Sequence, residues 1–301
     1  MLPFVVAKKL GQGVNDPIVA RLTLQNLEIL QNCAITEETK EKVQKLYLDE
    51  LTPKLVRCSQ IYEKLRAETE KLASSYKPPG KGAVSVELPQ VMELEEECRN
   101  YVAEATSFLQ SLVKVFNLLF GTSFTEASEW TIPRKPNPSV VGYAEANFLK
   151  QPDHIRYLQQ LPRCTEPFVR LRNAAFHPGG FNGNLVVRNF RFEPDGTLAV
   201  PDWRREKDGK TEYGPVSIVD DMRVGVHNLL TLGEDILVMW AVDHAAMPGL
   251  MEMSVIPENA RNPGCPIKYK MSLQQSVLGE LLGQTARAPH SSSVRPGGAR
   301  A

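Results

Sequence analysis

The pattern between Pro89 and Leu119 constrains the fold more than any other part of the sequence. Apolar side chains recur there every three or four positions for about eight helical turns, at Val91, Leu94, Cys98, Tyr101, Ala105, Phe108, Leu112, Phe116 and Leu119. Several glutamates stand near the start of the stretch, where the positive end of a helix dipole favours them, and Gly121 provides a stop. The same spacing is typical of a coiled-coil seam, but the flanking segments are amphipathic too, which favours a helix packed inside a bundle.

The sequence before this stretch predicts further helices. Residues 16–75 again carry apolar side chains at helical spacing. Thr36 stands before two glutamates and opens one helix, whereas Thr52 is the expected cap of a second helix with Pro53 at its first position. Residues 76–82 are rich in proline and glycine and are interpreted as a linker.

A change of period after residue 183 predicts a three-stranded meander. The expected strands are Leu185–Phe192, Thr197–Trp203 and Thr211–Val219. Asp195-Gly196 and Asp208-Gly209 are the expected hairpin turns, because aspartate and glycine tolerate the positive φ angles that such turns need.

The remaining segments predict short helices and a loop. Three prolines make residues 126–139 a loop, and short helices are expected at about 143–150 and 153–161. A longer helix follows the meander, over about 221–240, and a final short one is expected at Leu273–Leu282.

Together these segments predict a mainly α protein, a helical bundle with a small three-stranded antiparallel β insertion directly after one helix. We expect an N-terminal helical region over residues 1–80 and a helical domain over residues 85–285, with the β meander at about 183–219. Residues 286–301 have the composition of a disordered tail.

Charge and cysteine content exclude several classes of function. The 301 residues include 35 basic and 35 acidic side chains, so no overall field attracts nucleic acid or an anionic membrane, and any such contact must be local. The five cysteines are scattered, without C-x-x-C spacing, which predicts free thiols in a reducing compartment. No run of about 18 apolar residues indicates a membrane span. We therefore expect a cytoplasmic protein without membrane partners.

Nothing in the sequence predicts a metal ion or an organic cofactor. No ligand spacing connects the histidines outside the candidate motif described below, which are His154, His227, His244 and His290. The segment Gly11–Gly13 lacks the third glycine of a dinucleotide-binding loop. Asp220 and Asp221 begin a helix, where a capping role is favoured over a metal site.

The stretch RLRNAAFHPGG, which begins at Arg170, carries the candidate site. Thr165 is the expected N-cap of its helix. Pro178 disfavours a helical backbone at His177, and two glycines follow, so the helix is expected to end near Phe176. His177 then lies at the negative end of the helix dipole, which favours its protonated form.

Helical geometry divides the polar residues of this stretch between two faces. Arg170, Asn173 and His177 share one face, whereas Arg172 lies on the apolar side. An unpaired buried charge is costly, so Arg172 must find a partner or reach a cleft. Arg172 and His177 are ~140° apart on an ideal helix. They converge only if the length of the arginine and the broken helix end allow it, or if a second subunit supplies one of them.

The hexapeptide from Arg172 to His177, RNAAFH, resembles the R-x4-H motif of the HEPN superfamily, which favours a polar residue directly after the arginine. In that superfamily the motif lies in a compact helical bundle and is often followed by an irregular or β segment and another helix. The resemblance covers about residues 89–243. It implies metal-independent RNA cleavage by a homodimer whose paired motifs form one cleft. The superfamily also includes catalytically silent binding modules.

Each residue of the motif has an expected role under this resemblance. His177 would transfer a proton near neutral pH. Arg172 would hold the phosphate and stabilise the charge of the transition state. Asn173 would orient the imidazole, since it lies one turn before His177. Arg170 is an alternative phosphate contact on the histidine's face.

A weaker signal for RNA lies in the meander. Trp203, Arg204 and Arg205 combine an aromatic ring with two positive charges, a combination that can stack on RNA and bind its backbone. A solvated hairpin is the favoured interpretation of the same residues.

Three hypotheses follow from the sequence. The first is a HEPN-type ribonuclease, a toxin or phage-defence effector with RNA as substrate, a homodimeric state and a neutralising protein partner. The second is a silent HEPN-like module that binds RNA, a nucleotide or a protein. The third is a helical interaction protein without a ligand site, in which His177 caps a helix end and Arg172 pairs with Glu166 or Asp221.

Overall fold

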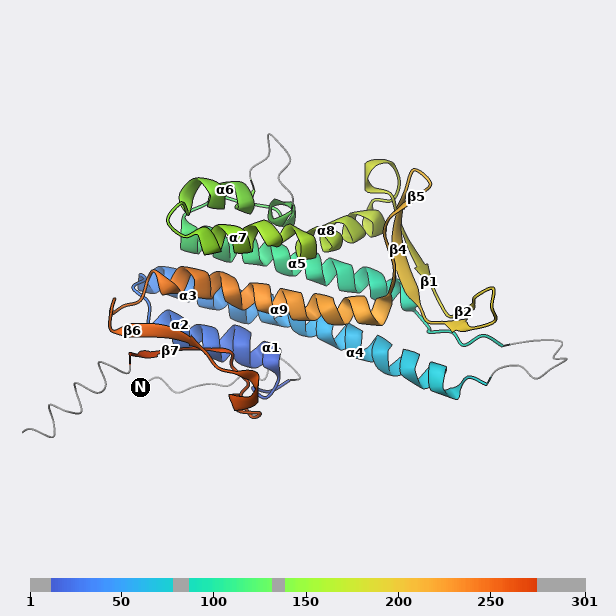
Figure 1. The fold of residues 1–301 in the computed structure, drawn as a ribbon, viewed down its shortest axis with the longest axis horizontal. Helices are drawn as coiled ribbons and strands as arrows, with labels where there is room; N and C mark the ends of the chain where they lie inside the picture. The colour runs from blue at the N-terminus through green and yellow to red at the C-terminus, as the bar shows by residue number, and fades with distance from the viewer. Residues whose placement is uncertain (1–11, 78–86, 132–138, 275–301) are drawn as a thin grey trace, which may run out of the picture.

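The computed structural model describes residues 12–77, 87–131 and 139–274. Four long helices that lie alongside one another form its framework (Figure 1). These helices are α4 (Thr52–Ser75), α5 (Leu94–Phe120), α8 (Pro162–Phe176) and α9 (Ile218–Val242). The prediction of a mainly α chain is confirmed. Within the described ranges, no helix combines the length and apolar character needed to span a membrane.

Helix α5 lies at the centre of the hydrophobic core and contacts α4, α8 and α9. Its predicted stripe is buried, and Phe108 and Phe116 have no exposed surface. The helix ends at Phe120, before Gly121, as the pattern predicts. It begins at Leu94 rather than near Pro89, because the side chain of Asn189 binds the backbone of Val91, accepting from its N–H at 3.0 Å and donating to its carbonyl at 2.8 Å.

Two continuous helices of the N-terminal region, the second of which includes α4, each contain a wide π turn. The first is made of α1 (Pro17–Val19), the π turn Ala20–Gln25 and α2 (Asn26–Gln31), and the second of α3 (Glu37–Lys45), the π turn Leu46–Leu51 and α4. Thr36 caps α3, since its hydroxyl accepts a hydrogen bond from the Thr39 N–H at 3.3 Å. The N-terminal region and the rest of the chain contribute buried side chains to the same core.

The predicted boundary at Thr52 is wrong. Thr52 is fully buried and lies inside a helix that runs without a break from Glu37 to Ser75. Pro53 normally ends or kinks a helix, because its ring clashes with the carbonyl four residues earlier and it has no N–H to donate. The π turn Leu46–Leu51 directly precedes it and widens the helix there, so the proline is accommodated without a break.

A three-stranded antiparallel sheet follows α8 and stands at one end of the helices (Figure 1). Its strands, in the spatial order β1-β4-β5, are β1 (Asn184–Arg188), β4 (Asp202–Lys207) and β5 (Lys210–Ser217). The predicted turn at Asp208-Gly209 joins β4 to β5. Ser217 then caps α9, so the last strand ends before the predicted Val219.

The predicted strands 185–192 and 197–203 are wrong in extent. The first is divided into β1 and the two-residue β2 (Arg191–Phe192), which pairs with β3 (Leu198–Ala199) across the Asp195-Gly196 turn. The central strand is therefore β4. Asp202 explains the break, because it binds both Arg188, at 2.9 and 3.0 Å, and Arg191. These charge pairs are formed across the sheet, beyond the reach of a local pattern.

Three shorter elements lie between α5 and α8 in the sequence. They are the 3-10 turn η3 (Ala127–Trp130), α6 (Val140–Asn147) and α7 (Pro152–Gln160). The predicted loop 126–139 thus contains a 3-10 turn, and residues 132–138 lie outside the described part of the chain. Trp130 is fully buried and its indole donates to the Leu109 carbonyl at 2.9 Å, which fixes η3 against α5.

The C-terminal part of the described chain forms a hairpin that the sequence did not predict. Its strands are β6 (Met251–Val255) and β7 (Tyr269–Leu273), with a 3-10 turn at Glu258–Ala260 between them. Leu273 therefore lies in a strand rather than at the start of a helix. Gln274 is not helical either, and residues 275–282 of the expected helix and the expected tail at 286–301 lie outside the described residues.

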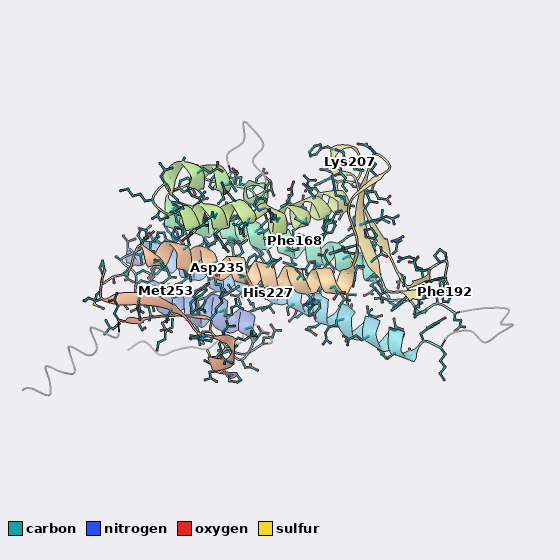
Figure 2. All side chains as sticks on the ribbon, in the orientation of Figure 1. Phe168, Phe192, Lys207, His227, Asp235 and Met253 are labelled. Atoms are coloured by element: carbon teal, nitrogen blue, oxygen red, sulfur yellow. The ribbon has the colours of Figure 1, made fainter. Side chains whose placement is uncertain are left out.

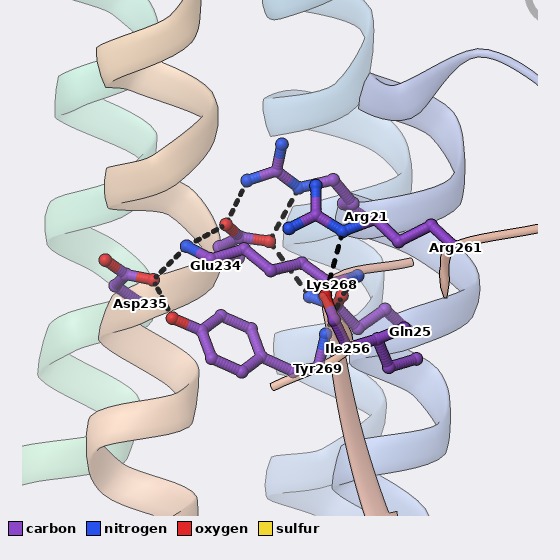
Figure 3. Close-up of polar contacts among 8 residues, drawn as sticks. All are labelled: Arg21, Gln25, Glu234, Asp235, Ile256, Arg261, Lys268 and Tyr269. Carbon is purple, nitrogen blue, oxygen red and sulfur yellow. Dashed lines mark hydrogen bonds and ion pairs between the residues drawn. The ribbon is translucent and has the colours of Figure 1, made fainter. Parts of the chain in front are cut away.

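A buried polar network attaches this hairpin to the helices (Figure 3). Glu234 of α9, which has no exposed surface, binds Arg21, Gln25 and Lys268. The side-chain oxygen of Gln25 accepts from the backbone N–H groups of Lys268 and Tyr269 at 2.6 and 2.8 Å. Segments from both ends of the described chain are thus joined through one carboxylate.

Glycine at position 225 allows α9 to pack closely against α5 and α8. A Cβ atom there would lie 2.3 Å from Tyr101 Oη and 2.9 Å from Cζ of Phe168, which Figure 2 shows between α8 and α9. Tyr101 cannot easily move away, since it is fully buried and donates to the Met222 carbonyl at 3.0 Å. The position therefore requires a residue without a side chain.

We expect Gly225→Ala to lower the free energy of unfolding by about 1–3 kcal/mol, because overpacking outweighs the better helix propensity of alanine. Urea denaturation measures this change. Val224→Ala is the matched control on the same helix: Val224 is 45% exposed, and its loss should change stability by no more than about 0.5 kcal/mol. An increase in stability for Gly225→Ala would contradict the close packing.

Candidate functional site around helix α8

The candidate site is built on the C-terminal end of α8. The helix ends at Phe176, and His177 follows in a non-helical conformation with φ −134° and ψ 62°. The Pro178-Gly179-Gly180 sequence accounts for this end, as expected. The His177 N–H still donates to the Asn173 carbonyl at 2.8 Å, which keeps the histidine in line with the last turn.

The start of α8 differs from the prediction. The helix begins at Pro162 rather than after Thr165, because proline is favoured in the first turn. Thr165 is buried inside the helix, where the single proton of its hydroxyl is shared between the Trp130 carbonyl at 2.8 Å and the Leu161 carbonyl at 3.0 Å. Thr165 therefore joins α8 to η3 instead of capping the helix.

The three residues expected to be catalytic lie together on the last turns of α8 but do not all contact one another. Arg172 donates from Nη1 to the Asn173 side-chain oxygen at 3.1 Å, and its guanidinium lies 5.6 Å from the Phe176 ring centre. The side-chain oxygen of Asn173 therefore accepts a hydrogen bond from Arg172, not from the His177 ring. His177 is exposed, and among the described residues its ring has no hydrogen-bond partner.

Arg172 reaches a hollow, as the helical-wheel argument requires of an unpaired arginine. A cavity of about 490 Å³ lies between α5 and α8, lined by Arg172, Asn173 and Phe176 together with Thr106, Ser107 and Gln110. No carboxylate among the described residues lies within ion-pair distance of Arg172. Neither expected partner takes it, because Glu166 pairs with Arg170 and Asp221 accepts from Trp203 and Tyr213.

A larger cleft lies on the other side of Asn173. Its volume is about 730 Å³, and its walls come from α8, the region of η3, the tip of β4 and β5, and the short 3-10 turn η4 (Gly180–Asn182). Asn173 and Val169 line both hollows, so the two form adjoining polar surfaces along α8. The cleft brings together residues from distant parts of the sequence, notably Arg170, Phe181 and Lys207.

Most carboxylates of the larger cleft are already engaged. Glu166 binds Arg170, and Glu212 binds Arg205 and lies 3.8 Å from Arg170. Glu129 accepts two backbone N–H groups, at 2.7 and 2.9 Å, in a capping box with Glu126. The cations without a carboxylate partner among the described residues of the two hollows are Arg172 and Lys207. The lining as a whole holds four glutamates and four cations, so its formal charges balance.

Two of the three residues predicted to bind RNA through the meander, Trp203 and Arg205, are buried and already hydrogen-bonded. Trp203 is 1% exposed, and its indole donates to Asp221 at 2.7 Å. Arg205 is 4% exposed and donates to the carbonyls of Asn182 at 2.7 Å and Phe181 at 3.1 Å. A ring or guanidinium packed in this way presents no free face to a ligand. Trp203 and Arg205 are therefore not available to bind RNA.

Arg204 and Arg170 are more accessible but are paired. Arg204 points to the other side of β4 and its Nε donates to Glu206 at 2.5 Å. Arg170 lines the larger cleft and also a neighbouring hollow between α8 and the sheet. Among the described residues, its buried Nε has no hydrogen-bond partner. Arg170 therefore retains a donor near the cleft in addition to its ion pair.

The electrostatics of this end of the molecule follow from burial and from these pairs. Burial raises the pKa of the Asp221 carboxyl, and hydrogen bonds from Tyr213 and Trp203 only partly oppose the rise. For Glu212, desolvation also acts to raise the pKa, but the hydrogen bond and charge of Arg205, with the charges of Lys207 and Arg170, prevail and lower it. Glu212 is thus held as an anion against the buried arginine.

Sequence reasoning missed Phe181, Lys207 and the cleft carboxylates other than Glu166, which it named only as a partner for Arg172. Their one local signal is an aromatic residue inside the glycine-rich and asparagine-rich segment GGFNGN, where no core is expected. In the described part of the chain, no group of three or more histidine, cysteine, aspartate or glutamate side chains is placed to hold a metal ion. Comparison of the chain with models of protein families, with curated proteins and with solved structures finds no match.

Proposed function

We propose that this chain is a HEPN-type endoribonuclease that binds single-stranded RNA along α8 and cleaves it without a metal ion. The observation that carries the proposal is Arg172, which extends into a polar hollow, has no carboxylate partner among the described residues and lies on the same helix end as the exposed His177. An arginine held without an acidic partner is available to bind a phosphate with two hydrogen bonds.

The chemistry needs only groups that RNA and the motif provide. His177 accepts the proton of the 2′-hydroxyl, whose oxygen attacks the phosphorus. The bond from phosphorus to the 5′-oxygen breaks, and that oxygen takes up a proton from water or from the second histidine of a dimer. Arg172 stabilises the additional negative charge of the transition state. The products are a 2′,3′-cyclic phosphate and a 5′-hydroxyl.

The decisive test is incubation of the purified protein with total RNA in the presence of EDTA. We expect cleavage that continues in the chelator, with cyclic-phosphate and 5′-hydroxyl ends. Absence of cleavage on every RNA tried would overturn the enzymatic proposal. The toxin or phage-defence role and the neutralising partner belong to the same proposal and fall with it.

One observation favours a second candidate, a catalytically silent module that binds RNA. The side-chain oxygen of Asn173 is occupied by Arg172, and no described residue orients the His177 ring. A general base works best when its ring is held in place. RNA binding without cleavage would support this second candidate.

We also propose a homodimer with the ends of α8 near its two-fold axis. The apolar side chain of Phe176, within the motif, is 46% exposed, and a second copy would cover it and could orient His177. Sedimentation at micromolar concentration is expected to give twice the chain mass of 33.6 kDa. A species of the single chain mass would count against a site shared between two copies.

A further inference from the structure

Phe181 presents a large apolar ring at the mouth of the 730 Å³ cleft. The residue is 66% exposed, and Lys207 Nζ lies 4.8 Å from the centre of its ring. Figure 2 places Lys207 at the tip of the sheet, beside the end of α8. An exposed aromatic residue is not unusual by itself. The hydrogen bonds that hold its backbone in place suggest that the ring has a binding role.

A buried arginine holds the backbone that carries the ring. Arg205 donates to the carbonyl of Phe181 itself at 3.1 Å and to that of Asn182 at 2.7 Å, and Glu212 binds the same guanidinium. Two hydrogen bonds from a buried, charged donor hold the short turn η4 firmly. The structure therefore fixes the main chain while the phenyl ring projects outward.

The same turn is tied to the motif histidine and to the sheet. Asn182 donates from Nδ2 to the His177 carbonyl at 3.1 Å, and the Gly179 N–H donates to the Gly183 carbonyl at 2.7 Å. Gly183 has φ +69°, and a Cβ atom there would lie 2.3 Å from the Glu206 carbonyl oxygen, so only glycine allows the turn to approach β4 this closely. The main chain that carries the ring is thus held at a set position relative to His177.

We propose that Phe181 and Lys207 form a binding subsite for one nucleotide of single-stranded RNA, with the base stacked on the ring and a phosphate bound by the lysine. Stacking on an aromatic ring beside a cation is the usual way in which proteins hold unpaired nucleotides. The subsite rests on the proposed function for its ligand class, and it lies beside the position where that function places the cleaved bond.

The surroundings of the ring favour a nucleic acid over an apolar protein segment. The cleft around Phe181 is lined by polar and charged side chains, among them Asn173, Asn182 and Lys207. Its four glutamates are engaged within the protein: Glu166 and Glu212 pair with arginines, and Glu126 and Glu129 form a capping box. A docking surface for an apolar helix would be a continuous apolar patch. Because every base has a π face, the subsite selects unpaired nucleotides with little preference for sequence.

The test uses an oligonucleotide that cannot be cleaved, so that binding is measured apart from catalysis. A fluorescein-labelled 2′-O-methyl decanucleotide lacks the attacking hydroxyl, and its anisotropy in EDTA at low salt gives the Kd. We expect Phe181→Ala to weaken binding by about 10-fold to 100-fold, and Phe181→Trp to retain it. Leu149→Ala, which removes another apolar side chain that is 76% exposed, should leave the Kd unchanged. Circular dichroism verifies that each variant is folded.

The outcomes separate this subsite from the proposed catalysis. Weaker binding by Phe181→Ala supports the subsite even if the wild-type protein cleaves no RNA. Equal Kd values for Phe181→Ala and the wild-type protein overturn the subsite even if cleavage is observed. A wild-type protein that binds no single-stranded oligonucleotide overturns both. A duplex of the same sequence should bind Phe181→Ala and the wild-type protein alike, and loss of duplex binding would contradict a stacking role.

Discussion

His177→Ala is expected to reduce RNA cleavage by about 10²–10⁴-fold, because it removes the group that accepts the proton of the 2′-hydroxyl. The measurement is the initial rate on one labelled oligonucleotide with EDTA present. Since His177 is exposed and its ring has no partner among the described residues, the free energy of unfolding should change by no more than about 0.5 kcal/mol. A large loss of activity with unchanged stability is the signature of a catalytic group.

Arg172→Ala should reduce the rate by a comparable factor, because it removes stabilisation of the transition-state charge. Arg172→Lys should recover only part of it, since an ammonium group cannot bind phosphate through two parallel hydrogen bonds. Arg156→Ala is the matched control: this arginine of α7 is 72% exposed and pairs with Asp153 within its own helix. Equal rates for the wild-type protein, His177→Ala and Arg172→Ala would assign the cleavage to a contaminant or to another site.

The same variants separate the three hypotheses. A ribonuclease loses activity in both variants and remains folded. A silent binding module shows no cleavage, and Arg172→Ala weakens its RNA binding whereas His177→Ala has little effect. A helical interaction protein shows neither cleavage nor binding. In that case His177 and Arg172 would affect only the end of α8, and the substitutions would appear as changes in stability.

The long helices were predictable because their signals are local. Nine apolar positions at helical spacing predict α5, and Gly121 marks its end. The end of α8 at Phe176 follows from Pro178 and the glycines after it. The start of α5 was misplaced because Asn189, which is far away in sequence, binds the backbone at Val91.

The sheet and the C-terminal hairpin depend on pairs that a sequence pattern does not display. Asp202 binds both Arg188 and Arg191, so the central strand of the sheet is β4 and not the predicted strand 197–203. Likewise, β7 is anchored through Gln25, which is separated from it by most of the chain. Ion pairs and side-chain hydrogen bonds between separate segments therefore decided the elements that the local pattern misplaced or missed.

The candidate site was predictable in its composition but not in its surroundings. The wheel argument requires Arg172 to find a partner or a cleft, and the structure shows a hollow beside it. The role of Arg205 could not be foreseen, since its donors reach the turn at Phe181 only after the chain has folded back. The same contact holds the backbone of a loop phenylalanine at a set position in the cleft.

The buried network of Figure 3 leads to the largest expected effect on stability. Both carboxylate oxygens of Glu234 are engaged: Oε2 accepts from Arg21 at 2.8 Å and Gln25 at 3.1 Å, and Oε1 accepts from Arg21 and from Lys268 at 2.9 Å. Arg21 is only 7% exposed and has no other carboxylate partner among the described residues. Its charge would be left uncompensated in the core if Glu234 were removed.

We expect Glu234→Ala to lower the free energy of unfolding by about 3–5 kcal/mol, the cost of leaving one member of a buried ion pair without its partner. Urea denaturation measures the change, and Glu252→Ala, which removes an exposed glutamate of β6, should have an effect within about 0.5 kcal/mol. The double variant Arg21→Met/Glu234→Ala should recover much of the loss, because replacement of both charges by apolar groups removes the uncompensated cation. If Glu234→Ala proved nearly neutral, Arg21 would have to reach solvent by another route. The recovery in the double variant therefore distinguishes the cost of a stranded charge from a simple loss of packing, which the second substitution could not repair.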